Sequence, residues 1–402
     1  MQSIKCKLAE FGLSITNSGA LAPCCQYIYT QKMNKYSYKE LRPFEVNNRQ
    51  KILEELDNGI QHNGCDLCWR AENNGKTSLR QWANEQYRDV DISNRGVTKV
   101  GNPEIVDLDL TIGNLCNLKC VMCGPYASTQ WVSEITKHRI KFQFNAFDTL
   151  GDPAFHDQWW DDPVLLDFIS NRAKDALKIN FTGGEPFMLP GLPEILKNVH
   201  ENNKNKKYTI QFNTNGTYAT DEILDRVVKF PNIKLIISLE GIGDHNDYIR
   251  FPSKWDKINE NIQKFRRYKA HYDLECNPLY ADDHDYKTFF ISVHHTLQPS
   301  SAHALPALAK YCEDNELPLT INFLHHGFFQ LSAITENQKQ SLLEWAKEKT
   351  SQYTDSAKDE VFNIISNVVP NSEETARYKR YVLFLDSIRN NSYEAVFGKF
   401  DD

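Results

Sequence analysis

Short apolar runs alternate with amphipathic segments through the middle of the chain, and this alternation constrains the fold more than any other feature. The runs are rich in β-branched residues, and the stretches between them have helical periodicity. Strands that alternate with helices form a parallel sheet with helices on its faces. Six such repeats, rather than the eight of a closed barrel, predict an α/β fold with a partial (β/α)6 TIM-like barrel. The expected strands are 105–112, 177–183, 208–214, 233–240, 289–296 and 319–324, and the expected helices are 192–201, 221–229, 257–268 and 304–315.

Two further segments flank this region. Residues 1–98 carry cysteines without the regular alternation, which predicts a cysteine-rich N-terminal module. The predicted barrel occupies residues 99–330. Residues 331–402 are polar, lack cysteine and have helical periodicity at 337–349 and 373–393, so we expect a helical C-terminal extension.

The charge balance and the hydropathy pattern exclude two classes of partner. The 402 residues include 46 Lys and Arg against 53 Asp and Glu, for a net charge of −7. This acidic balance does not build the positive field that nucleic acids attract. No window approaches the roughly 18 consecutive apolar residues of a membrane helix, and the N-terminal sequence lacks a signal-peptide pattern. We therefore expect a cytoplasmic protein with neither nucleic acid nor membrane as a partner.

The distribution of cysteines indicates metal binding. Eight of the ten cysteines fall in the first third of the chain, and only Cys276 and Cys312 lie elsewhere. We expect no disulfides, because the cytosol keeps thiols reduced. Thiols used as small apolar residues would scatter, whereas a soft metal needs several of them at one point. The clustering therefore favours metal sites.

Three of these thiols follow the first expected strand in one short loop, at Cys116, Cys120 and Cys123. Three cysteines at this spacing can hold one corner of an iron–sulfur cluster and leave a fourth iron without a protein ligand. An open coordination position allows a cluster to bind a substrate or cofactor directly, as at a catalytic zinc. The alternative is a structural zinc knuckle that takes its fourth ligand from elsewhere in the chain.

Polar turn motifs lie at the ends of the next three expected strands, where barrels of this kind keep their active sites. Glycines let a backbone approach a ligand closely, a carboxylate can receive a cationic amine, and a guanidinium can hold a carboxylate. Together with the three thiols, these groups describe a pocket for an amino-acid-like cofactor. The residues are Gly183, Gly184 and Glu185 after the second strand, Asn213 at the end of the third, and Ser238, Glu240 and Arg250 at and after the fourth.

Residues 103–325 resemble the radical S-adenosylmethionine (SAM) enzymes. The Cys-x3-Cys-x2-Cys pattern after the first strand is the signature of that superfamily, and the Gly-Gly-Glu-Pro, Thr-Asn-Gly and Ser-x-Glu-Gly motifs follow in its order. The resemblance implies that Cys116, Cys120 and Cys123 hold a 4Fe–4S cluster whose open iron binds the amino and carboxylate groups of SAM. It further implies that Gly183, Gly184 and Glu185 contact the amino group of SAM. Ser238 and Arg250 would contact its carboxylate, and Asn213 would lie on its ribose side.

Two positions depart from the family pattern. Met122 stands where an aromatic residue is usual, and Glu240 where Asp is common. A polarizable methionine side chain can still cover the adenine ring. The departures therefore bear on how adenine packs and leave the expected cofactor unchanged.

The resemblance also implies a reaction. SAM would be cleaved reductively to methionine and a 5′-deoxyadenosyl radical, which abstracts hydrogen from the substrate. We expect an oxidoreductase or transferase that acts on a peptide side chain in a maturation pathway or on a small molecule, with an electron donor such as flavodoxin or ferredoxin. The alternative class is a non-catalytic iron–sulfur redox or assembly protein that retains the barrel.

A second set of four cysteines, Cys6, Cys24, Cys65 and Cys68, lies in the N-terminal module. Two short strands around an Asn-Ser-Gly turn at 17–19 predict a hairpin that brings the first two together. Four thiolates saturate one centre, and their spacing alone does not separate zinc from an iron–sulfur cluster.

The spacing of these four cysteines resembles the auxiliary-cluster module called SPASM, or its shorter form, twitch. That module normally follows the barrel, whereas here it comes first. The resemblance implies a second 4Fe–4S cluster without an open iron. It leaves the role of Cys25 open between an alternative ligand and a non-ligating neighbour.

Two histidine pairs, His294-His295 and His325-His326, follow late strands and are assigned no catalytic role. Three aromatic residues before the second strand, Phe155, Trp159 and Trp160, are interpreted either as a cover for substrate or as core.

Overall fold

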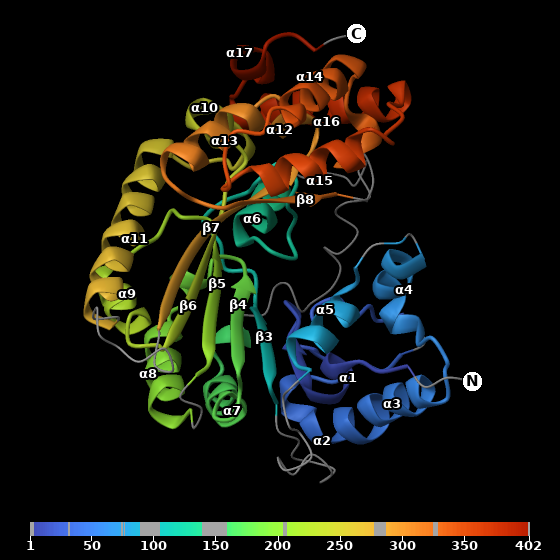
Figure 1. Cartoon of the computed structure of the whole chain (residues 1–402), viewed down its shortest axis with the longest axis vertical. Coiled ribbons are helices and arrows are strands. Elements are labelled where there is room, and N and C mark those ends of the chain that lie inside the picture. The colour runs from blue at the N-terminus through green and yellow to red at the C-terminus, as the bar shows by residue number, and fades with distance from the viewer. Residues whose placement is uncertain are drawn as a thin grey trace. The chain divides into compact units, whose positions relative to one another are not determined.

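The computed structural model describes residues 4–30, 33–73, 75, 77–88, 105–138, 159–203, 207–276, 287–324 and 329–400. Its strands form one eight-stranded sheet in the order β2-β1-β3-β4-β5-β6-β7-β8 (Figure 1). Neighbouring strands run parallel in the pairs β1–β3, β3–β4, β4–β5 and β7–β8, and antiparallel in β1–β2. The strands are β1 (Gly12–Ile15), β2 (Leu21–Ala22), β3 (Asp107–Ile112), β4 (Lys178–Gly183), β5 (Thr209–Thr214), β6 (Asn232–Ser238), β7 (Thr288–Leu297) and β8 (Leu319–Phe323).

The predicted fold class is confirmed. All six expected strands are present, and the mixed α/β architecture with its helical C-terminal part is that of a partial TIM-like barrel. The sheet has two strands more than expected, because the N-terminal hairpin joins it. Leu13 and Ile15 of β1 are buried and pair in register with Leu108 and Leu110 of β3, so this short apolar run extends the parallel sheet. Gly19 closes the hairpin at φ 77°, a conformation that favours glycine.

The chain divides into two compact units. The first comprises Met1–Asn114, Pro153–Phe212 and Asp225–Ile233, and the second Leu115–Asp152, Asn213–Leu224 and Lys234–Asp402. Helices of the first unit are α1 (Lys7–Phe11), α2 (Leu41–Phe44), α3 (Gln50–Asp57), α4 (Asp66–Asn73), α5 (Leu79–Gln86), α7 (Pro163–Ala173) and α8 (Leu192–Asn202), with short 3-10 or π turns η1 (Tyr38–Glu40), η2 (Glu45–Arg49), η3 (Asn63–Cys65), η6 (Trp159–Asp161) and η7 (Pro186–Met188).

The second unit contains all the helices of the C-terminal part of the chain. Its helices are α6 (Thr129–His138), α10 (Gly243–Ile249), α11 (Trp255–Cys276), α12 (Pro299–Ala302), α13 (Leu305–Asp314), α14 (Glu336–Lys347), α15 (Asp355–Ile365), α16 (Ser372–Arg389) and α17 (Tyr393–Phe397), with the 3-10 turn η10 (Leu331–Ala333). Helix α9 (Asp221–Val227) contains residues of both units.

Apolar side chains stack across one face of the sheet in the first unit. Ile15, Leu110, Phe181 and Phe212 are paired in register on neighbouring strands, and each is almost fully buried. The rings of Phe181 and Phe212 are stacked with centroids 5.1 Å apart. Aromatic pairs of this kind add to the free energy gained from burial.

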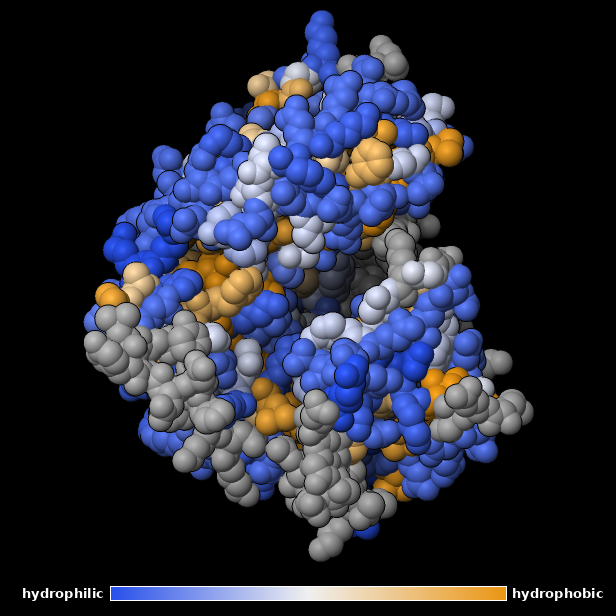
Figure 2. All heavy atoms as spheres, in the orientation of Figure 1, coloured by the Kyte–Doolittle hydropathy of each residue, from blue (hydrophilic) through white to orange (hydrophobic). Residues whose placement is uncertain are grey.

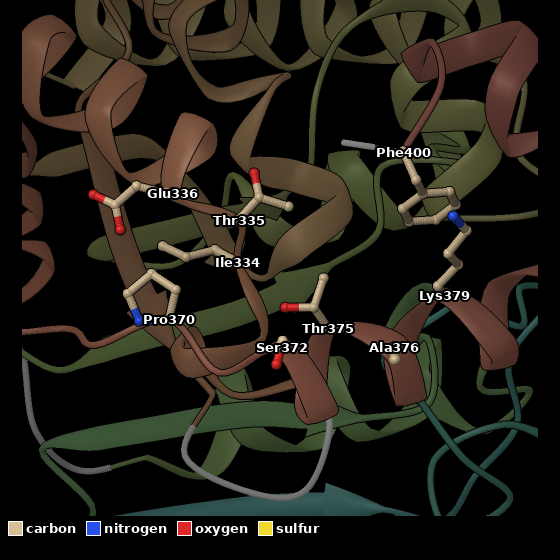
Figure 3. Close-up of a pocket in the computed structure, with 9 residues that line it drawn as sticks. All are labelled: Ile334, Thr335, Glu336, Pro370, Ser372, Thr375, Ala376, Lys379 and Phe400. Atoms are coloured by element: carbon tan, nitrogen blue, oxygen red, sulfur yellow. The ribbon is translucent and has the colours of Figure 1, made fainter. Parts of the chain in front are cut away.

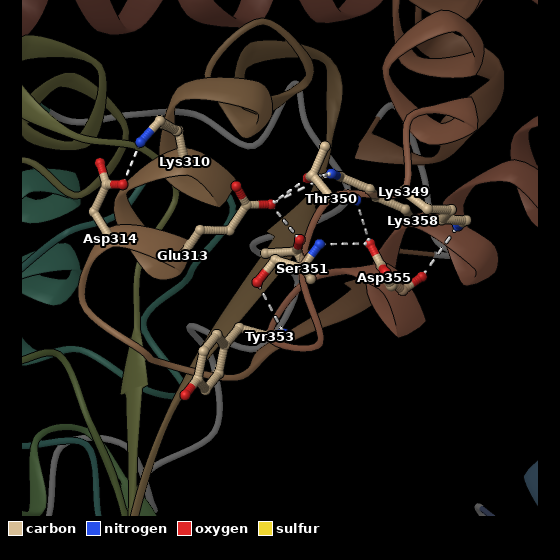
Figure 4. Close-up of polar contacts among 10 residues, drawn as sticks. Lys310, Glu313, Asp314, Lys349, Thr350, Ser351, Tyr353, Asp355 and Lys358 are labelled. Atoms are coloured by element: carbon tan, nitrogen blue, oxygen red, sulfur yellow. Dashed lines mark hydrogen bonds and ion pairs between the residues drawn. The ribbon is translucent and has the colours of Figure 1, made fainter.

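A polar network fixes helix α15 in the second unit (Figure 4). The Glu313 carboxylate at the end of α13 accepts hydrogen bonds from Thr354 (2.5 Å) and Thr350 (3.0 Å) and pairs with Lys358 of α15 (3.3 Å). The backbone N–H of Leu319 in β8 donates to the carbonyl of Tyr353 (2.9 Å). The loop before α15 is therefore held by both a helix and a strand of the barrel region.

The exposed face in Figure 2 is largely hydrophilic, with apolar side chains in scattered groups. Large apolar residues that remain exposed, such as Leu274 and Val369, lie far apart in the sequence. Among the described residues, no helix combines the length and the apolar character needed to cross a membrane.

Candidate functional site

The cysteine loop, residues 115–128, follows β3 in the chain and belongs to the second unit. Cys116 and Cys120 are buried and pack with Leu118, while Met122 and Cys123 are partly buried against them. Backbone bonds hold the loop on a neighbouring segment: the N–H of Lys119 donates to the carbonyl of Phe251 (2.7 Å), and that of Val121 to the carbonyl of Ile249 (2.7 Å). The three predicted thiols are therefore gathered on one anchored loop.

The environment of these thiols suits a soft metal centre. Burial, and then the neighbouring Cys120, raise the pKa of Cys123 to about 12. Burial also raises the pKa of Cys120, although Arg250 opposes that shift. A thiolate is the form that binds metal, and a bound metal supplies positive charge that stabilises thiolates in this buried setting. Two buried thiols and one partly buried thiol on one loop are thus a donor set that fits an iron–sulfur cluster.

Arg250 lies beside the cysteine loop and is buried. One terminal nitrogen donates to Glu240 Oε1 (2.7 Å), and the other lies 4.0 Å from the sulfur of Cys120. The second oxygen of Glu240 accepts from the backbone N–H of Thr296 (2.7 Å). Arg250 Nε is buried and has no hydrogen-bond partner among the described residues. Glu240 therefore orients Arg250, one terminal nitrogen of which faces Cys120, and the Nε–H remains available as a donor.

Asn215 was missed as a site residue, although its Thr-Asn-Gly motif was recognised. Its amide nitrogen lies 3.7 Å from the sulfur of Cys116 and donates to the Asn117 side chain (3.1 Å). Gly216 follows at φ 74° and turns the chain back. Asn213, which the sequence had favoured, has a buried side-chain oxygen without a hydrogen-bond partner among the described residues. Ser238 is the last residue of β6 and half-buried.

The glycine-rich motif after β4 belongs to the first unit. Gly183 has φ 119°, and a Cβ there would lie 2.9 Å from the carbonyl oxygen of Ile112, so only glycine fits. Gly184 follows at a half-buried position, and the buried Glu185 carboxylate accepts from the N–H of Phe187 (3.1 Å). This bond fixes the turn η7 and the direction of the carboxylate. The structure thus gathers the thiols, Glu240 and Arg250 in the second unit, and Gly183–Glu185 in the first.

The four cysteines of the N-terminal module line one cavity in the first unit. Cys6, Cys24, Cys65 and Cys68 line this cavity together with Trp69 and Arg80. Cys6 also caps α1, where its sulfur accepts from the N–H of Ala9 (3.4 Å). Burial raises the pKa of Cys65 to about 12, and the neighbouring Cys6 and Cys68 add to that shift.

Cys25 is not among the residues that line this cavity. The Cys25 residue is exposed. Within the described part of the chain, no group of three or more His, Cys, Asp or Glu side chains forms a site for a single metal ion.

Of the residues without an assigned role, His295 is fully buried, and its Nδ1–H donates to the Leu239 carbonyl (3.2 Å). Burial lowers the pKa of His295 to about 3 and that of His294 to about 4, so both are neutral. Trp160 is buried against Gly113, which favours the core interpretation. Phe155, His325 and His326 lie outside the described residues, as does the Trp159 side chain.

A buried polar row crosses the face of the first-unit sheet opposite the apolar one. Ser14, Asp109, Asn180 and Gln211 are paired in register on β1, β3, β4 and β5. The amide of Asn180 donates to Asp109 (2.8 Å), and burial raises the pKa of Asp109 to about 6. The alternation of Asp with Leu in β3 was the sequence signal for this row.

Asp109→Asn should increase stability at high pH. The folded-state pKa of Asp109 lies above its unfolded value of about 3.9, so ionisation disfavours the folded state above pH 6 and has no effect below pH 4. Urea unfolding at pH 8 should show a gain on the order of 2 kcal/mol that shrinks as the pH falls to 5. Asp167→Asn, at an exposed position of α7, is the matched control. A loss of stability at pH 8 would mean that the carboxylate makes favourable contacts.

A groove lies among the C-terminal helices of the second unit (Figure 3). Its lining mixes apolar and polar side chains, with Phe400 and Lys379 close together at one end and Ile334, Glu336 and Pro370 at the other. The Lys379 ammonium lies 5.3 Å from the centre of the Phe400 ring. None of the predicted site residues lines this groove.

Comparison with known proteins finds one matching family model. Residues 110–274 match the model of the Radical SAM superfamily. The matched residues include the cysteine loop described above. No curated protein matches the chain.

Several solved structures are similar to the chain at low identity. They include native anSMEcpe with bound AdoMet and Kp18Cys peptide (14% identity, TM-score 0.37, 58% of this chain and 57% of that chain). A second is Streptococcus suis SuiB bound to S-adenosylmethionine (12% identity, TM-score 0.34, 100% of this chain and 76% of that chain). A third is TYW1 with a lysine-pyruvate adduct bound (15% identity, TM-score 0.29, 58% of this chain and 68% of that chain). The chain spans less than two thirds of the anSMEcpe chains that it matches.

Proposed function

We propose that the protein is a radical SAM enzyme that cleaves SAM reductively and abstracts hydrogen from a substrate. The observation that carries this proposal is the juxtaposition of three thiols on one anchored loop with a guanidinium that keeps free donor capacity beside them. Cys116, Cys120 and Cys123 would hold a 4Fe–4S cluster. The chemistry that such a cluster supplies when bound is one-electron reduction of the SAM sulfonium, which breaks a C–S bond and yields methionine and a 5′-deoxyadenosyl radical.

The protein's own residues would bind and orient the cofactor. Arg250, held by Glu240, would receive the SAM carboxylate through its remaining N–H groups, with Ser238 as a second contact. Gly183, Gly184 and Glu185 would receive the amino group, since the glycines allow close approach and the carboxylate attracts an ammonium.

Two side chains would complete this cofactor pocket. The side-chain oxygen of Asn213 would accept a hydrogen bond on the ribose side. Met122 would cover the adenine ring. Burial of the surrounding residues would keep water away from the reacting atoms.

The N-terminal module would hold a second cluster of the twitch kind. Its four cysteines line one cavity, so each could provide one thiolate, and no iron would remain open. Such a cluster would relay electrons or support the substrate pocket. Cys25 would be a non-ligating neighbour, since it does not line the cavity.

The proposed substrate is a peptide side chain, because modules that resemble this one accompany peptide-modifying members of the superfamily. A small molecule is the alternative substrate, and flavodoxin or ferredoxin the proposed electron donor. The working site is proposed to be cytoplasmic, where the thiols stay reduced.

Reductive cleavage of SAM tests the proposal directly. After anaerobic reconstitution with iron and sulfide, the wild-type protein should convert SAM to 5′-deoxyadenosine when dithionite is added, slowly even without substrate. Chromatography with mass detection measures the product, and omission of dithionite is the control. A fully loaded protein that forms no 5′-deoxyadenosine would instead support the non-catalytic iron–sulfur alternative.

A further inference from the structure

The C-terminal helix α16 contacts the cysteine loop directly, within the second unit. The hydroxyl of Tyr381 donates to the carbonyl of Val121 (2.9 Å), between the second and third cysteines of the loop. The indole N–H of Trp131 in α6 donates to the carbonyl of Cys120 (3.0 Å). Tyr381, Val121 and Trp131 are fully buried in one core. Two consecutive carbonyls of the loop are thus fixed by aromatic side chains, one of which comes from the C-terminal part of the chain.

The last residue of α16 adds a buried charge behind the loop. Arg389 pairs with Glu134 of α6 through two nitrogens, at 3.1 and 2.7 Å from one carboxylate oxygen. Its guanidinium lies 4.7 Å from the Trp131 ring and 5.3 Å from the Phe251 ring. Lys119 of the cysteine loop pairs with the same carboxylate. Arg389 and Lys119 therefore share the Glu134 carboxylate, and these three side chains together have a net charge of +1.

This charge lies where it can act on the thiols. Cys120 is held at its carbonyl by Trp131, the residue over which Arg389 stacks. Arg250, the other buried cation beside the loop, is paired with Glu240. The Arg389–Glu134–Lys119 network is therefore a source of uncompensated positive charge behind the loop, and charge around a cluster sets its reduction potential.

We propose that α16 is a functional part of the cluster site, in which Tyr381 positions the cysteine loop and Arg389 raises the reduction potential of the cluster bound there. The proposal rests on the proposed function, because it requires a cluster on Cys116, Cys120 and Cys123. Reduction adds one negative charge to the centre, and a nearby cation stabilises the reduced form. Tyr381 is a positioning residue, since it acts through the loop, whereas Arg389 acts through its charge.

The test is a redox titration of the reconstituted full-length protein followed by electron paramagnetic resonance. The signal that changes when SAM is added identifies the loop cluster. Arg389→Gln should shift its midpoint potential to more negative values, while Arg389→Lys, which keeps the charge, should retain most of the wild-type potential. Glu134 keeps Lys119 as a partner in both variants, so no carboxylate is left unpaired. Arg380→Gln removes the same charge from an exposed position of α16 and should leave the potential unchanged.

The Tyr381→Phe variant allows a second test in which no charge is changed. It removes one hydrogen bond to the loop, and we expect faster loss of iron to a chelator at an unaltered initial iron content. Equal potentials for wild type and Arg389→Gln would overturn the electrostatic role, and equal rates of iron loss would overturn the positioning role. A wild-type protein that binds no iron at the loop would refute the proposed function instead, so the two failures are distinguishable.

Discussion

Joint replacement of Cys116, Cys120 and Cys123 by alanine should abolish the formation of 5′-deoxyadenosine. These thiols are the ones gathered beside Arg250, and an alanine loop offers no ligand for iron. Iron should fall from about eight atoms per chain to about four, since the N-terminal module keeps its own set of cysteines. Product analysis after reduction with dithionite measures the loss of 5′-deoxyadenosine. Iron and sulfide analysis with Mössbauer spectroscopy measures the loss of iron.

Cys276→Ser is the matched control, because Cys276 ends α11 and belongs to neither cysteine group. It should change neither the product nor the iron content. Persistent 5′-deoxyadenosine in the triple variant would refute the assignment of the loop. One zinc ion and no sulfide in that variant would identify the N-terminal site as structural zinc and remove its proposed electron-relay role.

Arg250→Met should lose both stability and cofactor affinity. Its removal leaves the fully buried Glu240 without a counter-charge, and breaking a buried ion pair in this way costs about 3–5 kcal/mol. The same change removes the charged donor that would hold the SAM carboxylate. Urea unfolding measures the loss of stability, and isothermal titration of the anaerobic protein measures SAM binding.

The double variant Arg250→Met, Glu240→Gln separates the two effects. A neutral amide at position 240 removes the unpaired charge and can still accept from the N–H of Thr296, so most of the stability should return. SAM affinity should stay reduced by about 1.5–3 kcal/mol, the contribution of a hydrogen bond to a charged group. Affinity at the wild-type level in the double variant would mean that the carboxylate of SAM binds elsewhere.

The strand pattern was predictable because local sequence and tertiary packing agree in the barrel region. The expected run at 289–296, for example, is β7 (Thr288–Leu297), and the run at 319–324 is β8 (Leu319–Phe323). Both alternate with amphipathic helices, so hydrophobic periodicity alone locates them. The hairpin turn at Gly19 could also be predicted from the sequence, since its conformation favours glycine.

Pairings between distant segments were not predictable from one sequence. The short run Gly12–Ile15 has no feature that indicates its partner, and only the structure pairs it with β3. Glu240 was assigned to the cofactor by resemblance, whereas the structure reveals its bonds to Arg250 and Thr296. The helices of residues 331–402 were expected from periodicity, but nothing in that pattern indicated that Tyr381 contacts the cysteine loop.

The bond between Tyr381 and Val121 has a consequence for the order in which the protein matures. The two residues are 260 positions apart in the chain, so the ribosome releases the cysteines long before it synthesises the tyrosine. A nascent chain that ends before α16 has the ligands of the loop without the core that packs around them. We therefore expect stable insertion of iron and sulfide to follow the synthesis of α16. Premature termination within α16 would yield a chain that contains every cysteine and still loads poorly.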